Sequence, residues 1–148
     1  MNEGQDFINS FNEDQYTQLF DKKENIELIR NSMFASTNEI RGTSYSSRIE
    51  DPKYQFAGKT GTSQVKRITE AERELDLATK DIDYKNRDHA LFIAFGPFKN
   101  PRYALSIVIE HGGSGSSVAA PLAKELFKLI IDRHDLREQA QTQKIINT

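Results

Sequence analysis

The sequence predicts an α+β fold in which an antiparallel meander of three strands is flanked by helices. Three observations support this prediction. Residues 89–98 and 102–111 are apolar and rich in aromatic or β-branched residues, as is typical of strands. Residues 54–62 form a shorter β-like run, and residues 118–134 are amphipathic at helical spacing. We therefore expect the last helix to pack on a sheet made by the three strands.

The first regular element is expected to be a helix of about ten residues that starts at Asn25. Ile26, Ile29 and Met33 recur at helical spacing, and Asn25 is a suitable N-cap residue. The following residues, 36–53, are rich in turn-forming types. We therefore expect turns between this helix and the first strand.

The middle of the chain is expected to contain a solvent-exposed charged loop followed by a hairpin. Residues 67–88 are highly charged and suggest a short helix only near residues 70–79. Asn100-Pro101 favours a tight turn between the two apolar strands. Those two strands should therefore pair in an antiparallel hairpin.

The last helix follows a glycine and serine loop at residues 112–117. Its sheet-facing side is predicted from the large apolar residues that share one face, namely Val118, Leu122, Leu126, Leu129 and Ile130. The opposite face carries Lys124, Glu125, Lys128 and Asp132. From Asp135 onward the chain is polar, and we expect this tail to fray.

Composition limits the classes of function that the chain can have. A formal net charge of −2 gives no basic field for nucleic acid, and the absence of cysteine excludes thiol catalysis and disulfides. His89, His111 and His134 are too dispersed to indicate a metal site, and the first two are expected to hydrogen-bond locally beside strands. No apolar run approaches 18 residues, and the N-terminal residues lack a secretion-signal pattern.

The stretch YQFAGKTGTSQV, residues 54–65, allows two interpretations. Gly58-Lys59-Thr60 has the letters that end a phosphate-binding loop, but such a loop needs a glycine at the position of Lys53 and must open into a helix. The residues after Thr60 suit a strand instead. The favoured interpretation is a strand that carries a lysine and hydroxyl groups into an acyl-transfer site.

Lys-Thr-Gly-Thr at residues 59–62 resembles the third motif of the penicillin-recognising serine acyltransferases. The flanking stretches KYQFAGKTGTSQV and RDHALFIAFGPFKNPRYALSIVIEHGGSGSSVAAPLAKELF closely resemble the end of the transpeptidase domain in the penicillin-binding protein 2 family. These are the elongation-type class B enzymes of bacterial wall synthesis. The resemblance covers residues 26–131. On this basis the chain divides into three parts. Residues 26–132 are the C-terminal portion of a penicillin-binding transpeptidase domain, residues 1–25 are a polar segment with no assignment, and residues 133–148 are a polar tail.

The resemblance implies a serine-type D-Ala-D-Ala transpeptidase that cross-links peptidoglycan stem peptides, binds β-lactams and needs no metal or other cofactor. Lys59 and Thr62 are the expected catalytic residues. Lys59 would help to organise proton movement, and the Thr62 N–H would be one of two oxyanion donors. Thr60 and Thr62 would offer hydroxyls to the substrate's terminal carboxylate. Gly61 would let the substrate backbone lie against the strand.

The family places a Ser-x-x-Lys nucleophile motif and a Ser-x-Asn motif far upstream, whereas only 58 residues precede Lys59. Residues 63–66, 36–38 and 10–12 have the letters of these motifs, but we interpret all three as fortuitous. In 63–66, strand alternation would put Ser63 and Lys66 on opposite faces, and none of the three would have a partner at the right geometry. The chain alone is therefore expected to be inactive.

Two hypotheses remain open at this stage. The chain is either the C-terminal segment of such an enzyme or a non-catalytic remnant or interaction module of the same fold. By resemblance, the enzyme would act at the periplasmic side of the bacterial inner membrane, beside a RodA-type glycan polymerase. An unpaired edge along residues 102–111 is also expected to permit self-association.

Overall fold

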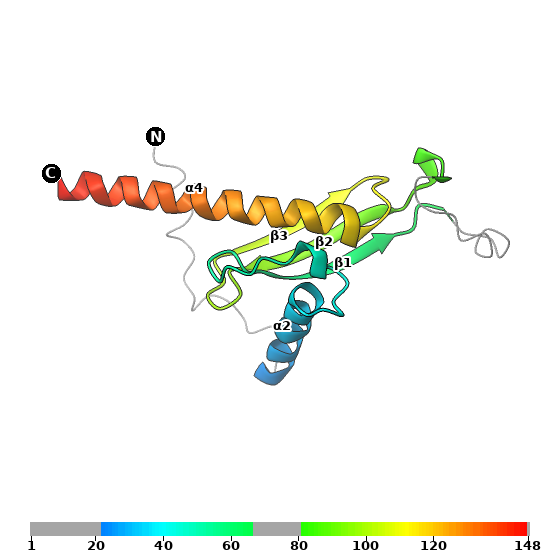
Figure 1. Cartoon of the computed structure of the whole chain (residues 1–148), viewed down its shortest axis with the longest axis horizontal. Coiled ribbons are helices and arrows are strands. Elements are labelled where there is room, and N and C mark those ends of the chain that lie inside the picture. Colours follow the sequence, from blue (N-terminus) through cyan, green and yellow to red (C-terminus); the bar gives the residue numbers. More distant parts are fainter. Residues whose placement is uncertain (1–21, 67–80, 148) are drawn as a thin grey trace.

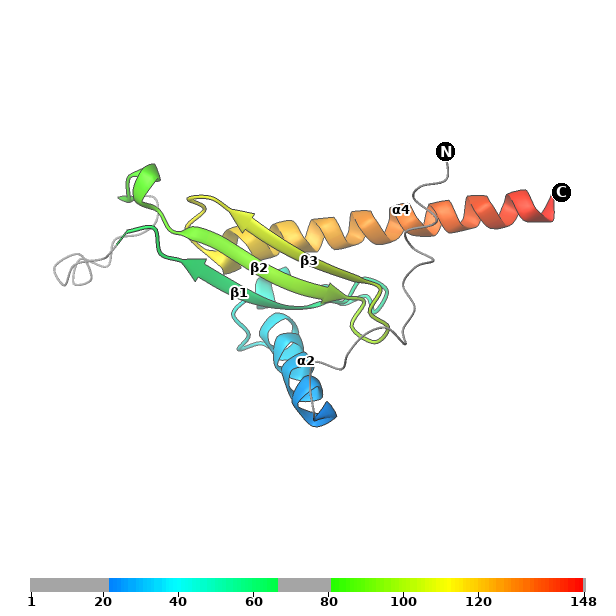
Figure 2. The same ribbon diagram turned by 180° about the vertical axis from the view of Figure 1, so that it is seen from behind.

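A computed structural model describes residues 22–66 and 81–147 of the chain. A three-stranded antiparallel sheet forms its centre, with one long helix lying along a face of the sheet and a shorter helix beside the first strand (Figures 1 and 2). The main elements are α2 (Lys23–Asn38), β1 (Ala57–Ser63), β2 (His89–Gly96), β3 (Tyr103–Ile109) and α4 (Ala120–Ile146). Three short turns complete them, the 3-10 helices η2 (Tyr45–Ser47) and η4 (Tyr84–Asn86) and the π-helical turn η5 (Gly115–Ala119).

The sheet has the strand order β1-β2-β3, which confirms the predicted meander and hairpin. Thr60 of β1 lies opposite Phe92 of β2, and Phe92 lies opposite Ile107 of β3. β2 is therefore the central strand, and β1 and β3 are the edges. No helix among the described residues combines the length and the apolar character needed to cross a bilayer.

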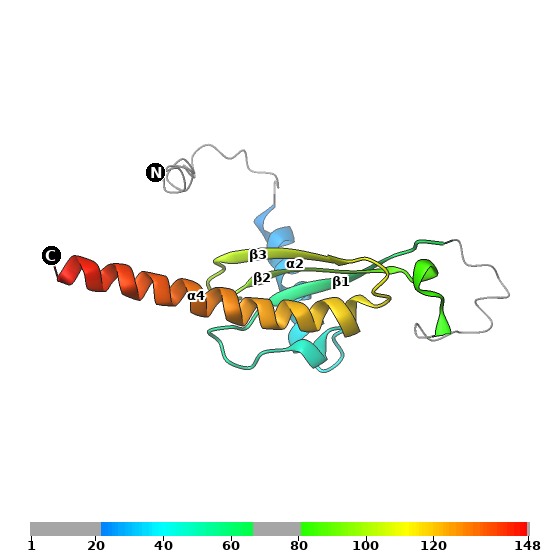
Figure 3. The same ribbon diagram turned by 90° about the horizontal axis from the view of Figure 1, so that it is seen from above.

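The core lies between the sheet and α4 (Figure 3). Burial alternates along β2, where Ala90, Phe92 and Ala94 are buried on the side that α4 covers. Phe56, just before β1, stacks on Phe127 of α4 with ring centroids 5.1 Å apart and meets Phe92 edge-on at 6.2 Å. These three fully buried rings join the sheet to the helix.

The predicted sheet-facing side of the last helix is only partly confirmed. Leu126 packs against the core and Ile130 is half-buried, but Val118, Leu122 and Leu129 are 37%, 45% and 63% exposed. The buried positions of the helix are instead Ala120, Ala123, Phe127 and Ile131. Small alanine side chains let the helix backbone approach the sheet closely, so the buried face is decided by fit to the aromatic rings and not by the size of the apolar side chains.

Both predicted helices extend further than expected. α2 has 16 residues and begins at Lys23, so Asn25 is not its cap, and its last turn includes residues 36–38, which were predicted as turn. α4 continues to Ile146, so the expected fraying after Asp135 is not observed. The glycine and serine loop closes into η5 before α4 begins, with the Ser114 hydroxyl accepting the Ser117 N–H. The predicted short helix near residues 70–79 lies outside the described residues.

A network of charged side chains links α4 to both edges of the sheet. Lys53 Nζ lies 2.9 Å from Asp132 and 3.1 Å from Asp135, and Tyr54 donates its hydroxyl to Asp132 at 2.6 Å. Arg102, just before β3, lies 3.1 Å from Asp135. The Tyr54 hydrogen bond and Lys53 lower the pKa of Asp132, and hydrogen bonds from Lys53 and Arg102 lower the pKa of Asp135.

The observed buried face of α4 predicts a contrast between two substitutions on the same helix. Phe127→Ala removes a fully buried ring and should lower the free energy of unfolding by about 3–5 kcal/mol. Leu129→Ala, at a 63% exposed position, should change it by less than about 0.5 kcal/mol. Urea denaturation measures both values. A larger loss of unfolding free energy for Leu129→Ala than for Phe127→Ala would mean that Leu129 and not Phe127 faces the core.

The charge network predicts the direction of the acid response. Because folding lowers the pKa values of Asp132 and Asp135, both stabilise the fold above their unfolded value of about 3.9, and this stability is lost as the pH falls through their folded values. Asp135→Asn should therefore be less stable than the wild type at pH 7 and should lose less stability on acidification. Melting temperatures between about pH 2 and 7 measure this dependence.

Glu125→Gln, also on α4, is the matched control because Glu125 forms no ion pair with any residue in 22–66 or 81–147. Its acid dependence should follow that of the wild type. Identical curves for wild type and Asp135→Asn would show that the network contributes nothing to stability.

Candidate functional site

The four predicted site residues lie together on β1, an edge strand of the sheet (Figure 2). One side of β1 pairs with β2, and no described strand pairs with the other side. Lys59 and Thr62 are exposed, and Thr60 and Gly61 are partly buried. The edge of β1 is therefore open over the whole Lys-Thr-Gly-Thr motif among the described residues.

Strand alternation divides the motif between the two faces of the sheet. Thr60 shares a face with its cross-strand neighbour Phe92, on the side covered by α4, and Thr62 lies on the same side. Lys59 and its partner Ile93 lie on the opposite face, where Ile93 is 51% exposed. The lysine and the threonine hydroxyls can therefore act on one ligand only at the free edge, where both faces meet.

Hydrogen bonds show which backbone groups of β1 point to that free edge. The carbonyls of Phe56 and Gly58 accept side-chain hydrogen bonds from α2, and the carbonyl of Thr60 accepts one from Lys59 Nζ at 2.8 Å. In an antiparallel pair, alternate residues direct both the N–H and the C=O away from the partner strand. The same alternation directs the N–H of Thr62 toward the free edge.

The ammonium group of Lys59 is the main charge at this edge. Lys59 is exposed, and within the part of the chain that the structure describes its side chain donates a hydrogen bond only to the Thr60 carbonyl. Among the described residues it forms no ion pair. A cation without an acidic partner can attract a carboxylate ligand or serve proton transfer.

The glycine loop supports β1 from the α4 side. A Cβ added to Gly115 would lie 2.6 Å from the Gly61 carbonyl oxygen and 2.5 Å from the Leu91 carbonyl oxygen. Only a glycine permits this close approach of three backbone segments. The start of η5 therefore forms a backing for the strand at the centre of the motif.

The predicted local roles of His89 and His111 are confirmed. The His111 N–H donates to His89 Nδ1 at 2.9 Å, and His111 Nδ1 lies 3.1 Å from the Arg87 carbonyl oxygen. His111 has a left-handed backbone with φ of 55°, and these contacts hold it in that conformation. The described residues include no group of three side chains that could hold a metal ion.

Sequence reasoning missed the polar residues that join α2 to β1. Thr37 and Ser44 are fully buried, with their hydroxyl oxygens 3.4 Å apart, and Ser44 also donates to the Ser36 carbonyl at 3.0 Å. Asn38 donates to the Phe56 carbonyl at 2.9 Å. The letters Ser-Thr-Asn at residues 36–38 therefore have a structural use here.

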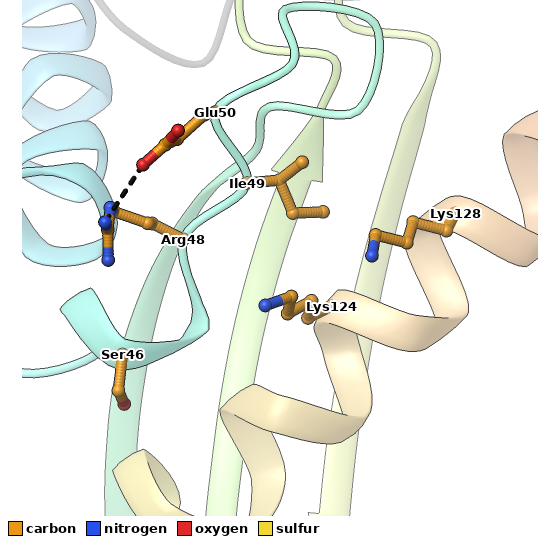
Figure 4. A pocket seen from close by; sticks show the side chains of 6 residues that line it. All are labelled: Ser46, Arg48, Ile49, Glu50, Lys124 and Lys128. Atoms are coloured by element: carbon orange, nitrogen blue, oxygen red, sulfur yellow. Dashed lines mark hydrogen bonds and ion pairs between the residues drawn. The ribbon is translucent and has the colours of Figure 1, made fainter.

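A separate hollow of about 330 Å³ lies between the loop after η2 and α4 (Figure 4). It is lined by Ser46, Arg48, Ile49, Glu50, Lys124 and Lys128. Arg48 forms an ion pair with Glu50 at 2.9 Å, and the two lysines reach toward the hollow from successive turns of α4. It contains none of the motif residues, so the candidate site remains at the edge of β1.

Comparison with known families finds the family that the Lys-Thr-Gly-Thr motif indicates. The family described as "Penicillin binding protein transpeptidase domain" matches residues 3–128. Peptidoglycan D,D-transpeptidase MrdA of Salmonella typhimurium is 35% identical over 105 residues, which is 71% of this chain and 16% of that protein. The protein of the same name from Acinetobacter baumannii is 43% identical over 79 residues, covering 53% of this chain and 11% of its own length. The chain thus spans only a small part of these relatives.

Solved structures agree with the fold. The penicillin-binding protein PBP2 of Helicobacter pylori, in complex with MreC, matches with a TM-score of 0.59 and 31% identity, over 74% of this chain and 17% of that one. PBP2 of Pseudomonas aeruginosa, in complex with WCK 5153, also matches with a TM-score of 0.59, at 30% identity over 77% of this chain and 21% of that one. The observed sheet and helices therefore occur within larger proteins.

The glycine contacts predict which glycine the fold requires. Gly115→Ala should lower the free energy of unfolding by about 1–3 kcal/mol, because its Cβ meets backbone atoms that cannot move away independently. Gly61→Ala should change it by less than about 1 kcal/mol, because the nearest atom is the Leu91 Cβ at 3.3 Å. Urea denaturation compares the two variants. Equal losses would argue that Gly61 is also needed for folding.

Proposed function

The chain belongs to the transpeptidase-domain family of penicillin-binding proteins, and from that premise we propose that it forms one wall of a peptidoglycan D,D-transpeptidase site of the penicillin-binding protein 2 type. The observation that carries this proposal is the open edge of β1, where the Lys59 ammonium group and the Thr62 N–H are both available. The alternative of a non-catalytic remnant or interaction module has no observation in its favour.

The proposed reaction is acyl transfer through a covalent intermediate. A serine supplied from outside this chain attacks the carbonyl carbon between the two D-alanines of a stem peptide. The C–N bond breaks, the leaving amine takes a proton, and D-alanine departs. An amine of a second stem peptide then attacks the resulting ester, which restores the serine and forms the cross-link.

Lys59 is proposed to act on charge and protons at this edge. The Lys59 side chain leaves the strand on the face opposite the side chains of Thr60 and Thr62. Its ammonium group reaches the Thr60 carbonyl at the free edge. When a substrate adds to the edge, the ammonium group can leave that carbonyl and approach the serine or the substrate carboxylate. There it would stabilise negative charge and assist proton transfer.

Thr60, Gly61 and Thr62 are proposed to bind the substrate. The Thr62 N–H would donate to the oxyanion of the tetrahedral intermediate, and loss of one such donor typically costs about 2.7–4 kcal/mol in the transition state. The hydroxyls of Thr60 and Thr62 would bind the terminal carboxylate. Gly61 presents no side chain, so a substrate backbone could lie against the strand.

The proposed ligands and partners follow from the same family. Peptidoglycan stem peptides are the proposed substrates, and β-lactams, which mimic their D-Ala-D-Ala end, are the proposed inhibitors. The proposed location is the periplasmic side of the bacterial inner membrane, beside a RodA-type glycan polymerase. Self-association through the outer edge of β3 is proposed for the chain when no other strand covers that edge.

The proposal predicts that Lys59→Ala abolishes transpeptidation in a complete enzyme that contains this segment. The rate of acylation by penicillin should fall by about 100-fold or more, since an electrostatic contact to the transition state is lost. The melting temperature should stay close to that of the wild type, because Lys59 is exposed. Lys124→Ala, an exchange of a lysine outside the motif, is the control and should acylate normally. Wild-type acylation by Lys59→Ala would contradict the proposed role.

A further inference from the structure

The C-terminal turn of α2 lies against the free edge of β1, immediately before the motif (Figure 2). Asn38 donates from its Nδ2 atom to the Phe56 carbonyl at 2.9 Å and to the Phe34 carbonyl, one turn back in its own helix, at 3.1 Å. The side-chain amide has two N–H donors, and these two carbonyls use both. Asn38 is therefore fixed between the helix and the strand.

Thr37 makes the second contact to the edge. Its side chain is fully buried, and its Oγ1 atom lies 3.5 Å from the Gly58 carbonyl oxygen and 3.4 Å from the Met33 carbonyl oxygen of its own helix. The end of α2 thus covers both outward carbonyls that precede Lys59, one through the hydrogen bond from Asn38 and the other through the buried Thr37 side chain. Among the described residues, the next outward carbonyl, that of Thr60, accepts a side-chain hydrogen bond only from Lys59.

We propose that Asn38, assisted by Thr37, is a positioning residue that sets the register of the substrate on β1. An extended peptide can add to an exposed strand edge by pairing with its outward N–H and C=O groups. The contacts of Asn38 and Thr37 close this edge at Phe56 and Gly58. Pairing can therefore begin only at Thr60. This inference rests on the proposed function, since it concerns the substrate of the same site.

Strand geometry explains why the edge needs to be closed before Thr60. Pairing along an edge repeats every two residues, so an uncapped edge offers a second register displaced by two residues. That displacement moves the scissile carbonyl by about 7 Å along the strand, away from the Thr62 N–H. A peptide bound in the displaced register would occupy the site without reacting. Thr37 covers Gly58, where the displaced register would pair, and Asn38 holds the end of α2 that carries Thr37 against Phe56.

The first experiment measures hydrolysis of an acyl-D-Ala-D-lactate depsipeptide by the complete enzyme and its Asn38→Ala variant. Unproductive binding in a second register lowers kcat and KM by the same factor and leaves kcat/KM unchanged. We expect both to fall about fivefold or more in Asn38→Ala, and to a smaller extent in Thr37→Val. A merely structural loss would lower the active fraction, which reduces kcat and leaves KM unchanged.

Ser36→Ala is the matched control within the same helix turn, because the Ser36 hydroxyl has Thr43 Oγ1, at 3.2 Å, as its only hydrogen-bond partner among the described residues. Its kcat and KM should equal those of the wild type. Unchanged kcat and KM in Asn38→Ala, or a loss of kcat alone, would contradict the proposal that Asn38 sets the substrate register. A wild-type enzyme that neither hydrolyses the depsipeptide nor reacts with penicillin would instead contradict the proposed function.

The second experiment does not depend on activity. In the 148-residue chain labelled with carbon-13, the carbonyl resonance of Phe56 should shift in Asn38→Ala, because that carbonyl loses the N–H that Asn38 donates to it. The carbonyl resonance of Thr60 should be the same in both proteins. An unchanged Phe56 resonance would show that Asn38 does not close the edge, and would overturn the proposal whatever the enzyme does.

Discussion

The packing of three aromatic rings between α4 and the sheet is the interaction on which the rest of the structure depends. Phe92 projects from the central strand, Phe56 precedes β1, and Phe127 projects from α4, so one cluster fixes the position of all three elements. The buried alanines of α4 permit this contact by letting the helix lie close to the sheet. β1 is held in register with β2 on one side and can leave its other side free for a ligand.

The free edge of β1 is covered at one end and open along the rest of the strand. Gly115 backs the strand at Gly61, and the end of α2 occupies the edge up to Gly58. With respect to the described residues, the part from Lys59 to Thr62 is open, and it combines a cation, two hydroxyls and an outward N–H. These are the groups that recognition of a peptide carboxylate and stabilisation of an oxyanion require. The groups proposed to bind the substrate therefore lie on the same short strand that α2 and η5 support.

The sequence predicted the elements whose signals are local. Alternating and β-branched residues identified β2 and β3, and the Lys-Thr-Gly-Thr motif with its flanks identified β1 and the family. The buried face of α4 was predicted only in part, because alanines carry little hydrophobic weight in a periodic pattern, yet they decide how closely a helix packs. The contacts of Thr37 and Asn38 to β1 could not be predicted, since they join residues 21 and 18 positions apart and leave no periodic signal. The ion pairs that Asp135 and Glu138 of α4 form with Lys53 and Arg102 likewise join residues far apart in the sequence.

The central claim is that this chain contributes the substrate-binding edge and that the nucleophile comes from elsewhere. Intact-mass spectrometry after incubation with excess penicillin tests it most directly, applied to the 148-residue chain and to a complete enzyme that contains it. The account predicts that the chain alone stays unmodified, and that the complete enzyme gains one penicillin on a serine outside this segment. A stoichiometric adduct on the chain alone, mapped to Ser36, Ser63 or any other of its serines, would contradict the account.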